Sequence, residues 1–311
     1  MLNIAAPSHA KLFNRLRFGL LMSAPKVSVI VSNYNYGRFL YSCLDAITNQ
    51  DYPNFEVIFI DDGSTDDSLE IAKNFSSRMR IISQNNRGVN SARNAGLHAA
   101  IGDYVALCDS DDIWEKNKLS LQMNLMSSSS GAILVSSGVR YFDSEGSYLY
   151  ESTPLYSGDI SKHFVRFPSS ALVINGPSAA IFRRDLALNI GGFDEKLRSN
   201  AEDWDFFRRL SQMGEFYFSH LPLVNVRIHD TSRSSVDLKT HYKGNLEAIK
   251  KAMADSYYNW TLVSQLQFLF RFELQYLKAS IKSRDPKQFA VSTKNMLSYK
   301  NALNVFRATN K

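Results

Sequence analysis

The chain has 311 residues, only two cysteines and no long uninterrupted apolar run. Cys43 and Cys108 lie in segments whose patterns predict a helix and a buried strand. We therefore expect free thiols and a reducing, cytoplasmic setting. No stretch approaches the roughly 18 consecutive apolar residues of a membrane-spanning helix. Residues 1–25 lack the long apolar core and small-residue cleavage pattern of a secretion signal, so we expect none.

The composition is that of a globular protein, because 44% of the residues are hydrophobic and 12% are aromatic. A chain of this length and composition can bury one large core or two fused smaller ones.

The net charge of +6 is unevenly distributed. Residues 1–26 carry four basic and no acidic side chains, and residues 282–311 carry seven basic and one acidic, which leaves a net charge of −4 for the middle. Basic ends can serve solubility, or they can attract anionic lipid with about 1 kcal/mol per Lys or Arg. No RNA- or DNA-binding motif is present, so we expect no nucleic acid partner.

Strand-like and helix-like segments alternate through the first 110 residues, which is typical of a parallel sheet covered on both faces. The predicted strands are Val27–Ser32, Phe55–Ile60, Met79–Ser83 and Tyr104–Cys108, and the predicted helices include Gly37–Gln50 and Val89–Ala100. A further helix should follow the second strand, with Ser64 and Asp67 as a capping pair at its start.

The second half of the chain has a looser, α+β pattern. Its predicted elements are strands at Ala132–Phe142, Ser178–Arg183 and Leu223–Ile228, a long loop at Tyr150–Asn175 and a helix near Asp203–Met213. After Val236 the pattern is helical, with one apolar stripe that predicts a packing surface. The stripe consists of Val263, Leu266, Phe270, Leu274, Leu277 and Ile281. We divide the chain into a basic segment 1–25, halves 26–115 and 116–235 of one catalytic domain, and a helical extension 236–311.

Three carboxylates, Asp109, Asp111 and Asp112, directly follow an apolar strand. Like charges this close repel one another, so a cation or strong hydrogen bonding is needed to keep them ionised. Oxygen ligands suit Mg²⁺ or Mn²⁺. The alternative is a solvated loop in which Asp112 caps a helix that begins near Trp114.

Two carboxylates also follow the second strand, in the turn Asp61–Ser64. Ligands of open α/β sheets bind beyond the carboxyl ends of the strands. A carboxylate there can accept hydrogen bonds from a nucleobase imide or a ribose hydroxyl. A turn-and-cap role without a ligand explains the same residues, and the spacing alone leaves both interpretations open.

Several motifs occur in one order between about residues 26 and 235. They are Val27-Ser-Val-Ile-Val-Ser-Asn-Tyr-Asn35, Asp61-Asp-Gly-Ser64, Asn86-Arg-Gly-Val-Asn-Ser-Ala-Arg-Asn94, Asp109-Ser-Asp-Asp112, Gly191-Gly-Phe-Asp194, Glu202-Asp-Trp-Asp-Phe-Phe-Arg208 and Arg227-Ile-His229. Together they resemble the family 2 glycosyltransferases. The resemblance implies a GT-A fold, a Rossmann-like mixed sheet flanked by helices, here with a C-terminal helical extension.

The resemblance also implies a nucleotide-sugar site in the first half. Ser32, Tyr34 and Asp62 match positions that line the base and ribose pocket, and Asp62 would contact a uracil-like imide. Arg93 would lie near the nucleotide.

The run Asp109, Ser110, Asp111 matches the family's Asp-x-Asp motif. The resemblance implies that these residues bind the donor, with Asp109 and Asp111 as ligands of a divalent Mn²⁺ or Mg²⁺ that bridges the diphosphate.

On the acceptor side, Asp203 matches the family's catalytic base and Glu202 is its neighbour. A carboxylate there can remove the proton of the acceptor hydroxyl while the metal stabilises the departing diphosphate. Without the resemblance, the two acidic residues could simply stabilise a helix N-terminus. Trp204 could line the acceptor site or belong to the core. His229 could contact phosphate or have a structural role.

We therefore expect an inverting, metal-dependent glycosyltransferase of hexosyltransferase type. It would move a sugar from a nucleotide diphosphate, with UDP favoured, to a hydroxyl of a glycan or lipid-linked acceptor in cell-surface polysaccharide synthesis. We place it in the cytoplasm, with peripheral contact to the inner face of an anionic membrane as a further hypothesis. The alternatives are a nucleotidyltransferase, which usually has a glycine-rich phosphate loop that Ser32–Arg38 lacks, and an inactive nucleotide-sugar-binding protein.

Overall fold

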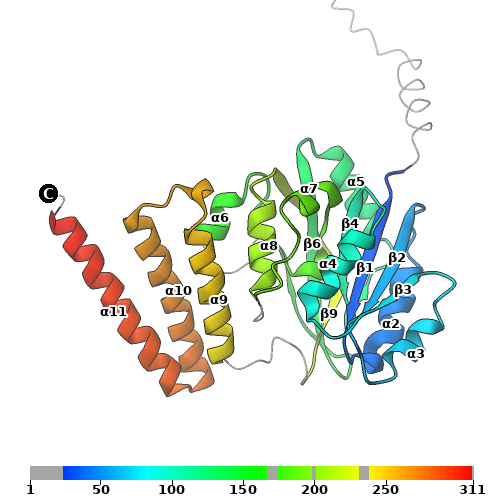
Figure 1. Ribbon diagram of the computed structural model, residues 1–311, viewed down its shortest axis with the longest axis horizontal. Helices are drawn as coiled ribbons and strands as arrows, with labels where there is room; N and C mark the ends of the chain where they lie inside the picture. Colours follow the sequence, from blue (N-terminus) through cyan, green and yellow to red (C-terminus); the bar gives the residue numbers. More distant parts are fainter. Residues whose placement is uncertain (1–23, 167–173, 198–200, 231–237, 310–311) are drawn as a thin grey trace, which may run out of the picture.

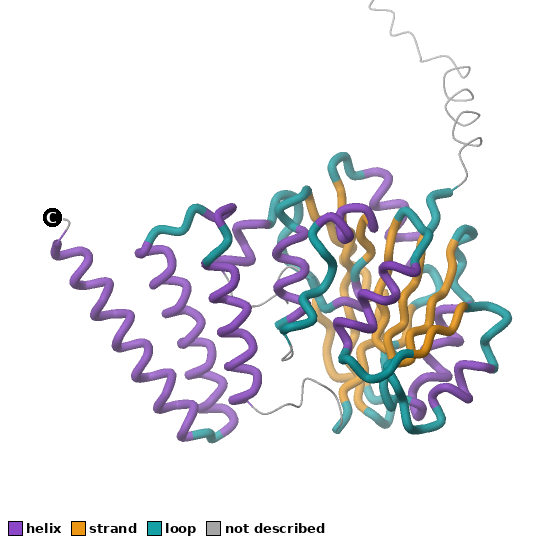
Figure 2. The backbone as a smooth tube through the Cα atoms, in the orientation of Figure 1, coloured by secondary structure: helices purple, strands orange, loops and turns teal. Residues whose placement is uncertain are grey.

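The computed structural model describes residues 24–166, 174–197, 201–230 and 238–309. Within these ranges, nine strands form one mixed sheet in the order β3-β2-β1-β4-β8-β6-β9-β5, with β7 paired to β6. Helices cover both faces of the sheet (Figures 1 and 2), which confirms the predicted fold class.

The strands are β1 Val27–Asn33, β2 Phe55–Asp61, β3 Arg80–Ser83, β4 Tyr104–Asp109, β5 Ile113–Trp114, β6 Ala132–Asp143, β7 Tyr148–Ser152, β8 Ile181–Arg183 and β9 Glu215–Ile228. The helices are α2 Gly37–Thr48, α3 Ser68–Lys73, α4 Val89–Ala99, α5 Lys118–Ser128, α6 Ser161–Arg166, α7 Arg184–Asn189, α8 Glu202–Leu210, α9 Leu238–Met253, α10 Leu262–Ser283 and α11 Pro286–Thr309, with short 3₁₀ turns η1 Pro177–Ala179 and η3 Ser256–Tyr258.

The first four strands are parallel and correspond to the four predicted strands. All seven residues of β1 are buried, as expected for a central strand covered on both faces. Successive residues alternate between two cores: Ile30 packs with the side of α4 and α8, whereas Val29 and Val31 pack with the side of α2, α3 and α5. A side chain at Gly96 of α4 would lie 2.3 Å from Ile30, so glycine allows this helix to approach β1 closely.

The predicted cap of the helix after β2 is wrong. That helix, α3, begins only at Ser68, so Ser64 lies outside it, and Asp67 at the N-cap position makes no side-chain capping hydrogen bond. Instead, the Ser64 hydroxyl accepts hydrogen bonds from the Asn33 side chain and from the Asn35 backbone N–H. Asp66 accepts from the backbone of Gly37, at the start of α2. These polar residues therefore join two loops at the strand ends.

The second half of the sheet is mixed, in agreement with the predicted α+β pattern. Strand β8 is antiparallel to both β4 and β6, while β6 and β9 run parallel. The segment predicted as a long loop, Tyr150–Asn175, contains the end of β7 and helix α6. The strand predicted to start at Ser178 starts at Ile181, because Pro177–Ala179 form a 3₁₀ turn.

The C-terminal helices lie in a row beyond the sheet, where α8 contacts α9, α9 contacts α10 and α10 contacts α11 (Figure 1). Since α10 has a neighbour on each side, its buried residues differ from the predicted stripe. Leu266 is buried as predicted, but Ile281 is 61% exposed. Buried Glu273 accepts hydrogen bonds from Tyr242 of α9 and Asn295 of α11, so a polar contact joins the three helices. None of the helices in the described ranges has the length and apolar character needed to span a bilayer.

Both cysteines are free and buried, as predicted, with their Sγ atoms 3.8 Å apart. Burial raises the pKa of the Cys108 thiol well above its ordinary value, and the hydrogen bond with Cys43 raises this pKa further. A raised pKa keeps this thiol protonated and unreactive.

A fully buried lysine at the start of α5 was not anticipated from the sequence. Lys118 Nζ donates to Gln122 Oε1 at 2.7 Å and lies 3.8 Å from the centre of the Trp114 ring. Burial lowers the pKa of Lys118 to about 7.

The titration of Lys118 predicts a pH dependence of stability. An unfolded lysine titrates near pH 10.4, so above pH 7 the unfolded chain binds more protons and the free energy of unfolding rises with pH. Lys118→Met should remove this rise, which amounts to about 1.4 kcal/mol per pH unit. Urea unfolding at pH 7, 8 and 9 measures it, with exposed Lys116→Met as the control. Equal slopes for Lys118→Met and wild type would contradict the prediction.

Candidate active site

The carboxyl ends of β1, β2 and β4 meet at one edge of the sheet. Their register places Ser32 beside Asp109 and Asn33 beside Asp61. A cleft of about 1280 Å³ opens at this edge. Among the residues predicted for the site, those that line the cleft are Ser32, Tyr34, Asp62, Asp109, Ser110, Asp111, Glu202 and Asp203. One cavity therefore brings together residues that are far apart in the sequence.

Two predicted residues do not line this cleft. Arg93 is 1% exposed and lies behind its wall. Trp204 is 5% exposed and belongs to the hydrophobic core, where its ring packs edge-on against Phe164. The core placement is the alternative that the sequence left open for Trp204.

Arg93 joins the two halves of the site. Its Nη2 donates to Asp109 at 2.9 Å and its Nη1 donates to Asp203 at 2.6 Å. Burial alone would lower the pKa of Arg93, but the charges of Asp203 and Asp109 outweigh burial and hold it above its ordinary value. The guanidinium is therefore a permanent cation between the carboxylate after β4 and the carboxylate at the start of α8.

The carboxylates after β4 repel one another. Burial and then the charge of Asp109 raise the pKa of Asp111, while a hydrogen bond with His229 acts in the opposite sense. Burial, followed by the charges of Asp111 and Asp109, raises the pKa of Asp112 well above its usual range. Additional positive charge at this point would therefore be stabilising.

The donor atoms after β4 fit a hard divalent cation. In the part of the chain that the structure describes, no group of three His, Cys, Asp or Glu side chains forms a ready metal site. Mg²⁺ commonly binds through one or two carboxylates and takes substrate phosphate oxygens as further ligands. Asp109 and Asp111 supply such carboxylates, and both line the cleft.

Asp62 organises the loop before α4. Its carboxylate accepts hydrogen bonds from the Gln84 side chain at 2.7 Å and from the backbone N–H groups of Arg87 and Gly88 at 3.0 and 2.8 Å. Gly88 has a φ of 92°, which favours glycine. Asp62 is thus a structural acceptor as well as a residue of the cleft wall.

The loop after β1 is held by local polar contacts. Asn35 has a φ of 58°, a left-handed conformation that asparagine tolerates. Its side-chain oxygen accepts from the Thr65 backbone N–H at 2.7 Å. These contacts place Tyr34, which is 43% exposed, at the cleft.

The structure adds Arg227 to the site and gives a defined contact to His229, whose role the sequence left open. His229 is buried, and its Nε2 lies 3.0 Å from Asp111 Oδ2. Arg227 lines the cleft between the rings of Phe39 and Phe142, at 4.7 and 4.5 Å from their centres. The Arg227-Ile-His229 motif was the signal available in the sequence. Only the folded structure shows that this motif lies beside Asp111.

A sequence model of glycosyl transferase family 2 matches residues 28–191. This chain belongs to glycosyl transferase family 2. The Escherichia coli chondroitin synthase is 27% identical over 251 residues, which are 77% of this chain and 34% of that protein. Glycosyltransferase GlyG of Streptococcus pneumoniae serotype 4 is 34% identical over 131 residues, 41% of this chain and 44% of that protein. The match with this protein therefore spans less than half the length of each of these two relatives.

Solved structures share the fold of this chain. Staphylococcus aureus TarS 1–349 in complex with UDP-GlcNAc superposes with a TM-score of 0.59 at 19% identity, covering 89% of this chain and 92% of that one. The mannosyltransferase PcManGT from Pyrobaculum calidifontis, in complex with GDP-Man and Mn²⁺, gives a TM-score of 0.58 at 16% identity, covering 95% and 90%. At such identities the likeness shows the GT-A fold alone.

Removal of the Arg93 cation should inactivate the enzyme. Arg93→Met leaves Asp109 and Asp203 without their shared partner, so both carboxylates should shift and turnover should fall about 100-fold. Steady-state release of nucleoside diphosphate measures this effect. The matched control is Arg183→Met, which removes a cation from a surface ion pair with Asp185 and should change little. Equal turnover in the two variants would contradict the assigned role of Arg93.

Proposed function

We propose that this family 2 glycosyltransferase transfers a hexose from a UDP-sugar to a hydroxyl of a glycan or lipid-linked acceptor, in cell-surface polysaccharide synthesis. The observation that carries the proposal is the link from Asp109 through Arg93 to Asp203, with both carboxylates at one cleft. A donor-side carboxylate and a candidate base thus lie where a donor and an acceptor can meet. The relative named chondroitin synthase supports the polysaccharide assignment.

The donor would occupy the half of the domain formed by residues 26–115. Ser32, Tyr34 and Ser110 line the cleft there, together with Asp62. The Asp62 carboxylate can accept a hydrogen bond from the imide N–H of uracil. The UDP-GlcNAc bound to TarS supports UDP as the nucleotide. The GDP-Man bound to PcManGT makes a guanine nucleotide the alternative donor.

The proposed metal ligands are Asp109 and Asp111, and the Mn²⁺ in the PcManGT complex supports this choice. Such an ion, when bound, neutralises charge that develops on the leaving diphosphate. The carboxylates of Asp109 and Asp111 would otherwise repel the diphosphate, while Arg227 supplies a positive side chain on the same cleft wall.

Asp203 is the proposed catalytic base. It lies in the first turn of α8 with Glu202, where the helix dipole stabilises negative charge. An ionised carboxylate there can take the proton of the acceptor hydroxyl while the hydroxyl oxygen attacks the anomeric carbon. Attack from the side opposite the diphosphate inverts the anomeric centre, as in the family. Residues 116–235 would form the acceptor half.

Peripheral contact with the inner face of an anionic membrane completes the proposal. The last described helix presents exposed Lys287, Lys294 and Lys300, and each basic residue near such a surface contributes about 1 kcal/mol. The basic segment 1–25 lies almost entirely outside the described residues.

A donor screen tests the reaction class. The protein is incubated with UDP-glucose, UDP-N-acetylglucosamine, GDP-mannose and dTDP-glucose in the presence of Mn²⁺, and the released products are identified. We expect nucleoside diphosphate from a UDP-sugar, and loss of release after EDTA because the carboxylates alone repel the leaving group. Pyrophosphate release would instead indicate a nucleotidyltransferase, and binding without release would indicate an inactive binding protein.

Asp203→Asn tests the base. The amide is nearly isosteric with the carboxylate but cannot accept the proton, so turnover should fall by a factor of about 100 to 10,000 while UDP binding, measured by calorimetry with Mn²⁺, is retained. Asp185→Asn, on the exposed start of α7, is the control. Wild-type turnover in Asp203→Asn would refute the assignment of the base.

A further inference from the structure

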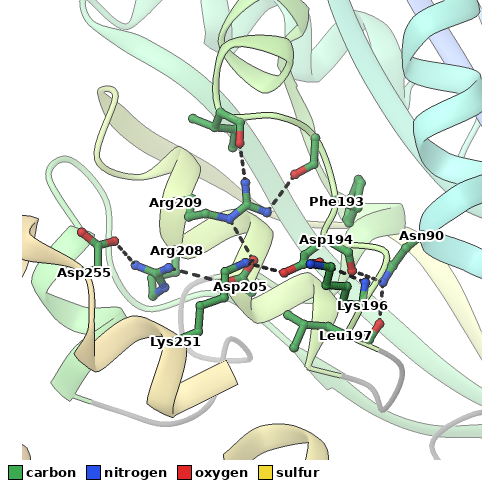
Figure 3. Close-up of polar contacts among 12 residues, drawn as sticks. Asn90, Phe193, Asp194, Lys196, Leu197, Asp205, Arg208, Arg209, Lys251 and Asp255 are labelled. Carbon is green, nitrogen blue, oxygen red and sulfur yellow. Dashed lines mark hydrogen bonds and ion pairs between the residues drawn. The ribbon is translucent and has the colours of Figure 1, made fainter. Parts of the chain in front are cut away.

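A buried carboxylate near the candidate base is surrounded by cations. Asp205, on α8, is 0% exposed. It accepts from Arg208 Nη2 at 3.3 Å, Arg209 Nε at 2.8 Å and Lys251 Nζ at 3.0 Å (Figure 3). The two arginines belong to the same helix as Asp205, whereas Lys251 comes from α9. The contact with Lys251 therefore ties Asp205 to a different element.

Lys251 also reaches the loop before α8. Its Nζ donates to Asp194 Oδ2 at 2.8 Å, and one ammonium group thus bridges Asp194 and Asp205 (Figure 3). Burial would raise the pKa of Asp194, but the hydrogen bond from Lys251 helps to hold it below its ordinary value. The carboxylates of Asp194 and Asp205 therefore share the ammonium group of Lys251.

The loop that contains Asp194 forms part of the cleft. Its neighbours Glu195, Lys196 and Leu197 line the cavity. The Asn90 side chain, at the start of α4, donates to the backbone oxygens of Asp194 at 2.9 Å and Leu197 at 2.7 Å. The loop is thus held from the donor side by Asn90 and from the helical extension by Lys251.

Helix α8 is tied to the same surroundings along its length. Arg209 donates to the backbone oxygens of Ile190 and Gly192, both at 2.8 Å, and Arg208 donates to Asp255 beyond α9 at 2.6 Å. Asp203 lies two residues before Asp205, within the first turn of this nine-residue helix. A rotation or shift of α8 would therefore move the Asp203 carboxylate relative to Arg93.

We propose that Lys251 is a positioning residue for the transfer reaction. It clamps α8 to the Asp194 loop and so sets the place of Asp203 and of the acceptor-side wall. The helical extension would thus be part of the catalytic unit, although Lys251 lies beyond residue 191, where the family match ends. This inference rests on the proposed role of Asp203 as the base.

A role in stability alone makes a different prediction. Buried ion pairs are poor evidence of net stabilisation, because desolvation of the charges offsets their attraction. After loss of Lys251, Asp205 keeps both arginines of its own helix, so the fold should tolerate the change. What is lost is the contact that joins α8 to both α9 and the Asp194 loop.

The test compares Lys251→Met, Lys251→Arg and Lys250→Met in the full chain. Lys250 is the adjacent, exposed lysine of α9 and is the matched control. Well below the melting temperature, Lys251→Met should lower kcat about tenfold and leave the KM for the donor unchanged, while Lys251→Arg should regain most of the loss. The donor is whichever nucleotide sugar the wild type turns over. A lower melting temperature with unchanged kcat would overturn the proposal.

Hydrogen exchange of the unliganded proteins gives a second readout, independent of activity. Amides of residues 202–210 should exchange faster in Lys251→Met than in wild type or Lys250→Met, because α8 has lost its ion pair with α9. Unchanged exchange in this segment would overturn the proposal even if turnover had fallen. Failure of the base assignment remains distinguishable, because it would appear as full activity of Asp203→Asn.

Discussion

The geometry of the candidate active site depends on the ion pairs of the buried Arg93 guanidinium. It is supplied by α4, and it holds one carboxylate at the end of β4 and another at the start of α8. A charged side chain that is 1% exposed requires compensation, since an unpaired buried charge is very costly. The two carboxylates supply this compensation and are at the same time the groups proposed to hold a metal and to accept a proton. The electrostatic requirement of the arginine thus brings these two carboxylates to one cleft.

The positions of the surrounding elements follow from this pairing. The parallel strands bring Ser32 and Asp109 to one edge. Gly96 lets α4 pack closely on β1, and Arg93 of the same helix contacts Asp109 at that edge. On the other side, α8 must present Asp203 to the same cation. The contacts of Asp205, Arg209 and Lys251 hold α8 in that place. Ion pairs therefore join α9 to α8 and, through Arg93, α8 to the end of β4.

Much of the fold was predictable from local patterns. The first four strands were predicted to within one residue at each end, because continuous apolar runs and turn residues identify buried parallel strands. The carboxylates of Asp62, Asp109 and Asp111 were identified because each follows one of these predicted strands. The cap at Ser64 was wrong, because its hydroxyl bonds to Asn33 and Asn35, residues about 30 positions away that no local rule includes.

Other features depended on tertiary contacts. The α10 stripe differed from its prediction because neighbours on both sides bury two faces, including polar Glu273. The sequence placed Arg93 near the nucleotide but gave no sign that it would contact Asp203, since 110 positions separate the pair. Lys118 and Lys251 resembled ordinary charged residues of helices. Their environments are set by helices and loops that pack together only in the folded chain.

The central claim is that the carboxylates after β4 and Asp203 serve one reaction centre that Arg93 holds together. The most direct measurement is a crystal structure of the protein with UDP and Mn²⁺, with anomalous scattering used to locate manganese. We predict one manganese peak beside Asp111 and the diphosphate, with Asp203 facing the sugar side of the same cleft and still bonded to Arg93. Bound UDP with manganese elsewhere, or with Asp203 turned away from the cleft, would contradict the account.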